Sequence, residues 1–207
     1  MIADKQKIPG SNSAALVVKL GGSLYNHVPD IVPVLRSSPY PLLIIPGGGP
    51  FANAVRQAGL DDETAHWEAI AAMGQYGRYI ASHDIPVTER LEVPHRTTLF
   101  LPGRCLREQD PLPHSWDVTS DTIAAWVAAV LRLDLLLLKS VDGIVTGGVL
   151  QEHVNTPQQT VIVDPLVIPY VLENRVDTFI LNGSRQELLA RYLRGDRVPG
   201  TRISTTF

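Results

Sequence analysis

Residues 16–23 read Leu-Val-Val-Lys-Leu-Gly-Gly-Ser, and the architecture can be built up from this stretch. An apolar run that contains one charged residue, Lys19, predicts a β-strand over 16–20 that is buried on both faces. The run ends in a turn at Gly21 and Gly22, where the missing Cβ atoms let an anion approach the backbone N–H groups closely. The pattern therefore indicates a cation beside bare amides at one strand end, an arrangement that suits a phosphate.

Apolar strands and helical patterns alternate along the rest of the chain. We predict strands over 16–20, 41–46, 98–101, 135–138, 161–163, 178–181 and 202–205. We predict helices over 28–36, 51–58, 64–82, 121–131, 164–174 and 185–194, with an irregular flap or edge over 85–113. This alternation predicts an α/β fold, a three-layer αβα sandwich with a mostly parallel central sheet, and without a convincing linker we expect one domain over 1–207.

Composition narrows the class of protein. The 207 residues are 44% hydrophobic and 19% charged, with a formal net charge of −3, which argues against a dedicated binder of nucleic acids or anionic membranes. A single cysteine, Cys105, excludes an intrachain disulfide and fits a reducing compartment. Residues 1–13 lack the apolar segment of a signal peptide, and no apolar run approaches the ~20 residues of a membrane helix. We therefore expect a cytoplasmic protein.

A second glycine-rich turn, Gly47-Gly48-Gly49, joins the strand over 41–46 to a helix, with Pro50 at a position that the first helical turn tolerates. Amides at a helix N-terminus attract anions, although a tight turn without a ligand would use the same residues. In parallel sheets, ligands bind outside the carboxyl ends of the strands, and the glycine turns all fall there. This shared position favours a binding site.

Two further stretches supply candidate polar groups. Asp117, Thr119 and Asp121 lie before or at the start of the helix over 121–131, where they could cap it, or where Asp121 could orient lysine side chains or water on a magnesium ion. The strand over 135–138 continues into Lys139-Ser140-Val141-Asp142-Gly143, which is either an ordinary Asp-Gly turn or a nucleotide-binding loop. Lys19 likewise could extend to water instead of pairing an anion.

Several common sites are absent from the sequence. The six histidines show no metal-binding spacing, so we expect no metal ligands from the protein. The sequence contains neither a Gly-x-Ser-x-Gly elbow nor a P-loop, and no complete Gly-x-Gly-x-x-Gly follows a strand. An acceptor phosphate is mostly ionised at pH 7 and needs no general base, so the lack of an obvious His–carboxylate pair fits a phosphate or carboxylate acceptor.

The ordered set of motifs resembles the amino-acid kinase superfamily, and the resemblance covers nearly the whole chain. The matching pieces are Lys19-Leu-Gly-Gly-Ser23, Pro46-Gly-Gly-Gly-Pro50, Asp117-Val-Thr-Ser-Asp121, Val141-Asp-Gly-Ile144 and Gly200-Thr-Arg-Ile203. The resemblance implies an ATP- and Mg²⁺-dependent phosphotransferase that forms homo-oligomers and acts on a small molecule. It also implies an acceptor side mainly over 1–120 and a nucleotide side mainly over 121–207.

The same resemblance implies a role for each candidate residue. Lys19 would contact the transferring phosphoryl group, and Asp121 would organise this lysine and its neighbours. ATP would be held by Gly21, Gly22 and Ser23, and on its nucleotide side by Lys139, Ser140, Val141, Asp142 and Gly143. The acceptor would be held by Gly47, Gly48 and Gly49, together with Asp117 and Thr119.

A short branch of that superfamily is more similar still, namely the furan-methyl phosphate kinases of methanofuran biosynthesis. The stretches that carry this likeness are His66-Trp67, Met73-Gly-Gln-Tyr-Gly77, Asp110-Pro-Leu-Pro113, Ser115–Asp121 and Leu138–Gly143. The likeness implies phosphorylation of [5-(aminomethyl)furan-3-yl]methyl phosphate to a diphosphate. The alternatives are another phosphate or carboxylate acceptor, such as isopentenyl phosphate, uridylate or an amino acid, or a non-catalytic binder of nucleotides or anions.

One departure from the superfamily concerns the catalytic cations. Many members carry a second catalytic lysine in their C-terminal half, whereas the four lysines of this chain include none after Lys139. Lys139, an arginine such as Arg185, or magnesium could take its place, and the sequence does not choose among them.

Overall fold

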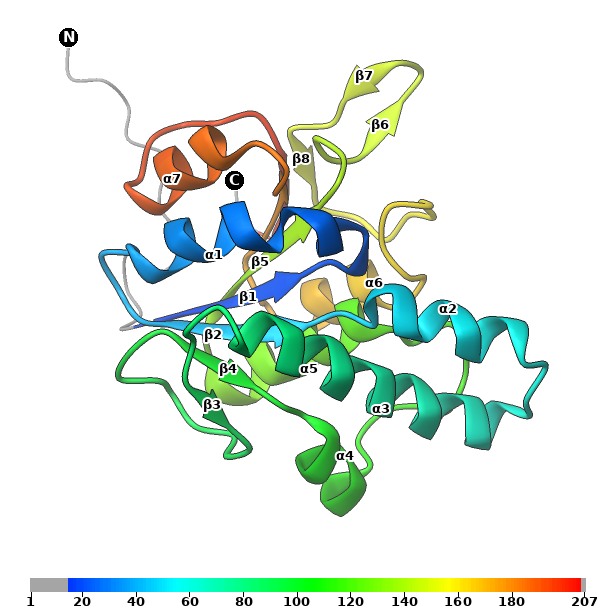
Figure 1. Cartoon of the computed structure of the whole chain (residues 1–207). Helices are drawn as coiled ribbons and strands as arrows, with labels where there is room; N and C mark the ends of the chain where they lie inside the picture. The colour runs from blue at the N-terminus through cyan, green and yellow to red at the C-terminus, as the bar shows by residue number, and fades with distance from the viewer. Residues whose placement is uncertain (1–14, 206–207) are drawn as a thin grey trace, which may run out of the picture.

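A computed structural model describes residues 15–205 of the chain, so residues 1–13, for which we expected no signal peptide, lie outside it. Its main sheet has eight strands in the order β3-β4-β2-β1-β5-β9-β10-β8 (Figure 1). At the centre, β1 (Leu16–Leu20) pairs in parallel with β2 (Leu42–Pro46) on one side and with β5 (Asp134–Lys139) on the other. All five residues of β1 are buried, as its apolar sequence predicts.

The outer strands extend the sheet in both directions. On one side lie β4 (Thr98–Phe100) and β3 (Val87–Thr88), and on the other lie β9 (Thr178–Asn182), β10 (Thr201–Ile203) and β8 (His153–Val154). The pair formed by β9 and β10 is antiparallel, and every other pair in this sheet is parallel. The predicted mostly parallel sheet is therefore confirmed.

Helices cover both faces of the sheet, which confirms the predicted three-layer α/β architecture (Figure 1). One face is covered by α1 (Val28–Arg36) and α7 (Gln186–Leu193), and the other by α5 (Ser120–Leu131) and α6 (Val167–Glu173). A further pair, α2 (Gly49–Gln57) and α3 (Asp62–Ala81), packs side by side, and α3 also contacts β2 and β4. The helix α5 is buried nearly all round because it consists almost entirely of small and apolar residues.

The two-residue period of β1 determines which way Lys19 points. Leu16, Val18 and Leu20 belong to the apolar cluster under α1 and α7, whereas Val17 belongs to the cluster under α5 and α6. Successive side chains of a strand alternate between faces, so Lys19 shares the α5 side of the sheet with Val17. The single charge of this strand therefore faces the start of α5.

The structure differs from the sequence-based expectations in three places. Residues 161–163 form a bend and not a strand, because the sheet edge beside β10 is occupied by β8 and Val161 is almost fully exposed. The stretch 85–113, expected to be irregular, contains a short helix, α4 (Gly103–Gln109), besides β3 and β4. A small separate hairpin of β6 (Val145–Thr146) and β7 (Val149–Leu150) was not expected, and it turns at two glycines with positive φ.

The start of α5 is held in place by one buried carboxylate, that of Asp164. Its Oδ2 accepts hydrogen bonds from the N–H and hydroxyl of Thr119, each at 2.8 Å, and from the N–H of Thr122 at 3.1 Å. Its Oδ1 accepts from the Thr122 hydroxyl at 2.5 Å and from the Val167 N–H at 3.1 Å. A negative charge at a helix N-terminus is favourable, and here it joins the first turn of α5 to the first turn of α6.

The substitution Asp164→Ala should lower the free energy of unfolding by about 2–4 kcal/mol, because it leaves several buried donors without an acceptor. Chemical denaturation followed by circular dichroism measures this change. The exposed Glu68 of α3 offers a control, and Glu68→Ala should stay within about 0.5 kcal/mol of the wild type. Equal effects of the two substitutions would contradict the role given to Asp164.

Candidate active site

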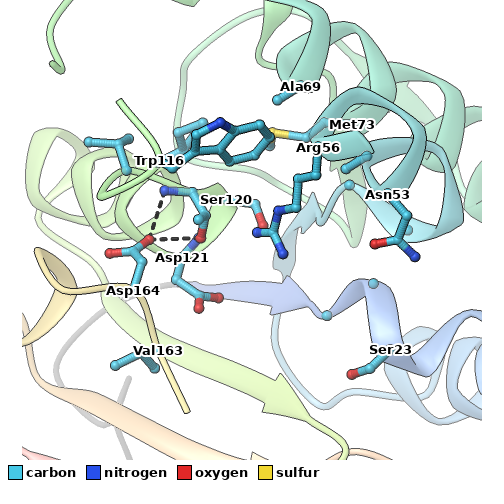
Figure 2. Close-up of a pocket in the computed structure, with 18 of the residues that line it drawn as sticks. Ser23, Asn53, Arg56, Ala69, Met73, Trp116, Ser120, Asp121, Val163 and Asp164 are labelled. Atoms are coloured by element: carbon cyan, nitrogen blue, oxygen red, sulfur yellow. Dashed lines mark hydrogen bonds between the residues drawn. The ribbon is translucent and has the colours of Figure 1, made fainter. Parts of the chain in front are cut away.

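A cavity of about 870 Å³ lies where β1, β2 and β5 end (Figure 2). The first glycine turn contributes Gly21, Gly22 and Ser23 to its wall, and the second contributes Gly48 and Gly49. Lys19, Thr119, Asp121 and Lys139 also line it. The structure therefore brings four of the sequence motifs, far apart in the chain, into one cavity at the carboxyl edge of the sheet.

Three charged side chains form a cluster in this cavity. The Nζ of Lys19 lies 2.7 Å from Oδ1 of Asp121, and the Nζ of Lys139 donates a hydrogen bond to Oδ2 of the same carboxylate. Lys19 and Asp121 are 4% and 2% exposed, so water screens them little. Two ammonium groups around one carboxylate leave one positive charge uncompensated among the three, which favours a negatively charged ligand beside them.

Strand register explains why these two lysines meet. Lys19 is opposite Leu137 in the parallel pair of β1 and β5, and Lys139 lies two residues beyond Leu137 on the same face. Both ammonium groups therefore approach the α5 side of the sheet, where Asp121 occupies the first turn of α5. Of the alternatives left open by the sequence, Lys139 is the cation that the fold places beside Lys19, while Arg185 lies 3.6 Å from Asp142 and does not line the cavity.

Burial and the neighbouring charges have opposing effects on the pKa values of Asp121 and Lys139. Burial alone would raise the pKa of Asp121, but the two neighbouring ammonium groups outweigh it and lower that pKa below its usual value. Burial, together with the like charge of Lys19, lowers the pKa of Lys139 to about 8, although the Asp121 carboxylate opposes the change. Asp121 is thus an anion at neutral pH, and Lys139 is a cation that loses its proton more easily than an ordinary lysine.

The two glycine turns touch each other through their backbones. A Cβ on Gly22 would lie 2.6 Å from the backbone N of Gly49, and one on Gly47 would lie 2.8 Å from the backbone N of Gly22. Such distances are too short for any side chain, so only glycine allows this contact. The 3₁₀-helix Gly22–His27 starts at one turn and α2 at the other, so two helix N-termini meet at the cavity, where N–H groups favour anions.

Other residues predicted for the site lie outside the cavity wall. Gly47 supports the contact just described, and Asp117 is exposed. Ser140, Val141, Asp142 and Gly143 follow β5 but do not line the cavity. Asp142 accepts a hydrogen bond from Asn182 Nδ2 at 2.8 Å, and the N–H of Ile144 donates to Thr201 Oγ1 at 2.8 Å, so this loop is joined to β9 and β10.

A second part of the wall is formed by Arg56 of α2, which the sequence did not indicate, and by Trp116, which belongs to the stretch Ser115–Asp121. The Cζ of Arg56 lies 5.0 Å from the centre of the Trp116 ring, and Figure 2 shows the Arg56 side chain extending beneath that ring into the cavity. Ala69 and Met73 of α3 add apolar surface nearby. No motif marks Arg56 or Ala69. Met73 and Trp116 lie in stretches that carry the family likeness, but only the packing of α2 and α3 against the segment before α5 brings these residues together.

The resemblance to the amino-acid kinases implies Mg²⁺, and the carboxylates of the cavity test whether the protein could hold it. Among the described residues that line the cavity, the carboxylates are Asp62, Asp121 and Asp164. Asp121 is taken by two lysines and Asp164 by the starts of two helices, so they do not form the set of free oxygen ligands that a protein-held Mg²⁺ requires. The residues present do not fit a magnesium site built from protein ligands alone.

Comparison with known proteins places this site in context. Over 208 aligned residues the chain is 26% identical to the [5-(aminomethyl)furan-3-yl]methyl phosphate kinase of Methanocaldococcus jannaschii, with 90% of this chain and 96% of that protein covered. No family model matches the chain.

Three solved structures share the fold. The uridylate kinase of Archaeoglobus fulgidus superposes with a TM-score of 0.66 at 19% identity, covering 91% of this chain and all of that one. The UMP kinase of Ureaplasma parvum gives 0.71 at 16% identity over 92% and 98% of the two chains. An isopentenyl phosphate kinase gives 0.60 at 17% identity over 91% and 100%.

The fold is therefore that of the amino-acid kinases, as the motifs predicted. The named relative and the structural neighbours are all kinases, which supports a phosphotransferase. The expected likeness to a [5-(aminomethyl)furan-3-yl]methyl phosphate kinase is also confirmed, at the level of a distant relative. Among the described residues, no helix is long and apolar enough to cross a membrane.

Because the chain has only four lysines, the titration of Lys139 can be observed directly. In protein labelled with ¹³C-lysine, one Cε resonance should titrate near pH 8 in the absence of ligands, while ordinary lysines titrate near 10.4. The substitution Lys139→Arg should remove that resonance, and Lys7→Arg should leave it in place. A Lys139 resonance that first moves above pH 10 would contradict the electrostatics described here.

Proposed function

We propose that this protein is an ATP-dependent kinase that converts a small phosphomonoester into a diphosphate, with [5-(aminomethyl)furan-3-yl]methyl phosphate as its acceptor. The observation that carries the proposal is the buried cluster of Lys19, Asp121 and Lys139, which has an excess positive charge and lies beside two glycine turns. A relative that covers nearly the whole chain and is named for that acceptor supports the choice.

In this reaction an oxygen of the acceptor phosphate forms a bond to the γ-phosphorus of ATP, the bond from that phosphorus to the β–γ bridging oxygen breaks, and ADP leaves. Catalysis of phosphoryl transfer consists mainly of positioning and of stabilising charge on the transferring group. Gly21, Gly22 and Ser23 would hold the phosphates of ATP, and Gly48 and Gly49 would hold the acceptor phosphate. Because the two turns touch each other, both anions would then be held in one place.

The lysines would neutralise the negative charge that accumulates there. Lys19 would contact the transferring group, and Lys139 would act as the second catalytic cation. Asp121 touches both ammonium groups and would keep them charged and directed toward the phosphates. Mg²⁺, when bound, would add positive charge while being held mainly by the phosphates.

The outer part of the cavity would recognise the rest of the acceptor. Three aromatic residues in the stretches that carry the family likeness are candidates for stacking on a furan ring. Tyr76 is fully buried and Trp67 does not line the cavity, whereas Trp116 does. Arg56 would contact the acceptor phosphate, and Asp62, which lines the cavity where Asp117 does not, would pair the ammonium group.

Several broader features belong to the same proposal. The acceptor would bind mainly to residues 1–120 and the nucleotide mainly to residues 121–207, including the loop from Lys139 to Gly143. We further propose a cytoplasmic enzyme that acts as a homo-oligomer and binds neither nucleic acid nor membranes.

Replacing Lys19 should test the chemical step. Lys19→Met should lower kcat by about 10²–10³-fold, the size expected when one group that stabilises transition-state charge is removed. The exposed Arg90 offers a control, and Arg90→Met should retain wild-type turnover with the same circular dichroism spectrum. A folded Lys19→Met protein with wild-type turnover would refute the role of this lysine.

The identity of the acceptor can be tested by measuring ADP release with [5-(aminomethyl)furan-3-yl]methyl phosphate, isopentenyl phosphate, uridylate and N-acetylglutamate. The furan phosphate should give the highest kcat/KM. Arg56→Gln should lower kcat/KM for it by about 10–100-fold, through the loss of a charge-assisted hydrogen bond, with the KM for ATP nearly unchanged. Higher activity with another acceptor would assign that acceptor instead, and tight ATP binding without transfer to any of them would favour a non-catalytic binder.

A further inference from the structure

Outside the charged cluster, a second group of side chains gathers where α3 meets the segment after α4. It consists of His66 on α3, Asp110 at the end of α4, and His114 four residues later. Each of the three offers a ligand atom, and these atoms all lie within 4.8 Å of one another. His66 also lines the cavity, so this group lies at the cavity rim.

The hydrogen bonds of His114 give its two ring nitrogens different roles. Its Nε2 lies 2.7 Å from Oδ1 of Asp110, and its Nδ1 lies 2.5 Å from Oε2 of Glu63. The rings of His66 and His114 are stacked, with centroids 4.1 Å apart. In metal sites, a ligating histidine commonly donates its other N–H to a carboxylate, which fixes the ring and its tautomer. Glu63 is placed to accept that hydrogen bond.

Neighbouring groups hold this arrangement together. The indole Nε1 of Trp67 donates to Oε1 of Glu63 at 2.9 Å, and the Trp67 ring packs edge-on against His114 with centroids 5.2 Å apart. Glu63 and Trp67 therefore fix the orientation of the His114 ring.

We propose that His66, Asp110 and His114 bind a divalent transition-metal ion of the zinc class, with Glu63 orienting His114 from outside. Two imidazole nitrogens and one carboxylate oxygen form a ligand set that suits Zn²⁺ or Co²⁺ and is a poor match for Mg²⁺, which prefers oxygen ligands. When the metal binds, the proton between Nε2 of His114 and Asp110 is released to solvent, Nε2 and the Asp110 carboxylate become ligands, and the N–H at Nδ1 keeps its hydrogen bond to Glu63.

The proposed metal ion would also affect the cavity. Asp110 and His114 belong to the segment that carries Ser115 and Trp116 to one side of the cavity. His66 belongs to α3, which lines another side of the same cavity. A metal bound to all three would join the two sides. This inference goes beyond the proposed kinase activity and does not depend on it.

The same contacts would also form without a metal if His114 were an imidazolium held between the carboxylates of Glu63 and Asp110. In that case His66 only stacks on His114 and contributes no ligand atom. The two arrangements therefore differ in what His66 does when a metal is added.

The test uses Co²⁺ with the full-length chain after dialysis against a chelator and then against chelator-free buffer, without ATP or acceptor. Calorimetry should show one saturable Co²⁺ site, and the visible spectrum should show absorption bands of Co²⁺ with nitrogen ligands. His66→Ala and His114→Ala should each weaken binding by more than about 10-fold, and Glu63→Gln by about 10–100-fold, the range typical of such outer partners. His95→Ala, at an exposed histidine outside the group, should bind as the wild type does.

Circular dichroism would first establish that each variant is folded, and His66→Gln would replace His66→Ala if the latter is not. Absence of saturable Co²⁺ binding to the wild type would overturn the proposal. Binding that survives unchanged in the folded His66 variant would overturn it as well, because it would leave His66 as a stacking partner alone.

Discussion

The carboxylate of Asp121, held between the ammonium groups of Lys19 and Lys139, is the interaction around which the functional part of this protein is organised. Three charges in a buried place are costly to assemble, and the two ammonium groups, which repel each other, are tolerable only because the carboxylate lies between them. The central strands supply the lysines and α5 supplies the acid, so the cluster exists only when sheet and helix are correctly docked. The charged cluster therefore forms only when the chain folds.

A second carboxylate, that of Asp164, maintains this geometry without touching the lysines. It binds the first turn of α5 and the first turn of α6 at the same time, and so determines where Asp121 stands relative to the sheet. The two acids have different partners and different tasks. Asp121 is surrounded by cations and controls charge, whereas Asp164 is surrounded by N–H and hydroxyl groups and controls position.

Much of the fold could be predicted because its elements carry strong local patterns. Strands such as β1 and β5 are continuous apolar runs, and the glycine turns mark their carboxyl ends, so a cavity at that edge follows from the topology of parallel sheets. The strand predicted over 161–163 was wrong because apolar composition does not provide a neighbouring strand. The helix α4 was missed because the prolines around it indicated irregular structure.

The candidate site divides in the same way. Lys19, Asp121 and the glycines could be named from the sequence, and strand register then shows which cation meets Lys19. Arg56 and His114 belong to no motif. His66, Asp110 and Trp116 lie in stretches that carry the family likeness, but the sequence did not show which residues they meet, because that depends on how α2 and α3 pack against a distant segment. Local sequence carries no record of such contacts, and only the assembled chain brings them together.

The backbone contact between Gly22 and Gly49 has a consequence for how this protein can diversify. Because neither turn has room for a side chain, the proposed phosphate-binding centre is closed to gradual change, and a substitution in one turn has no compensating partner in the other. Changes of acceptor preference must then arise on the wall around Arg56 and Trp116, where side chains face open space. An engineer seeking a new acceptor would leave the glycines alone and vary that wall.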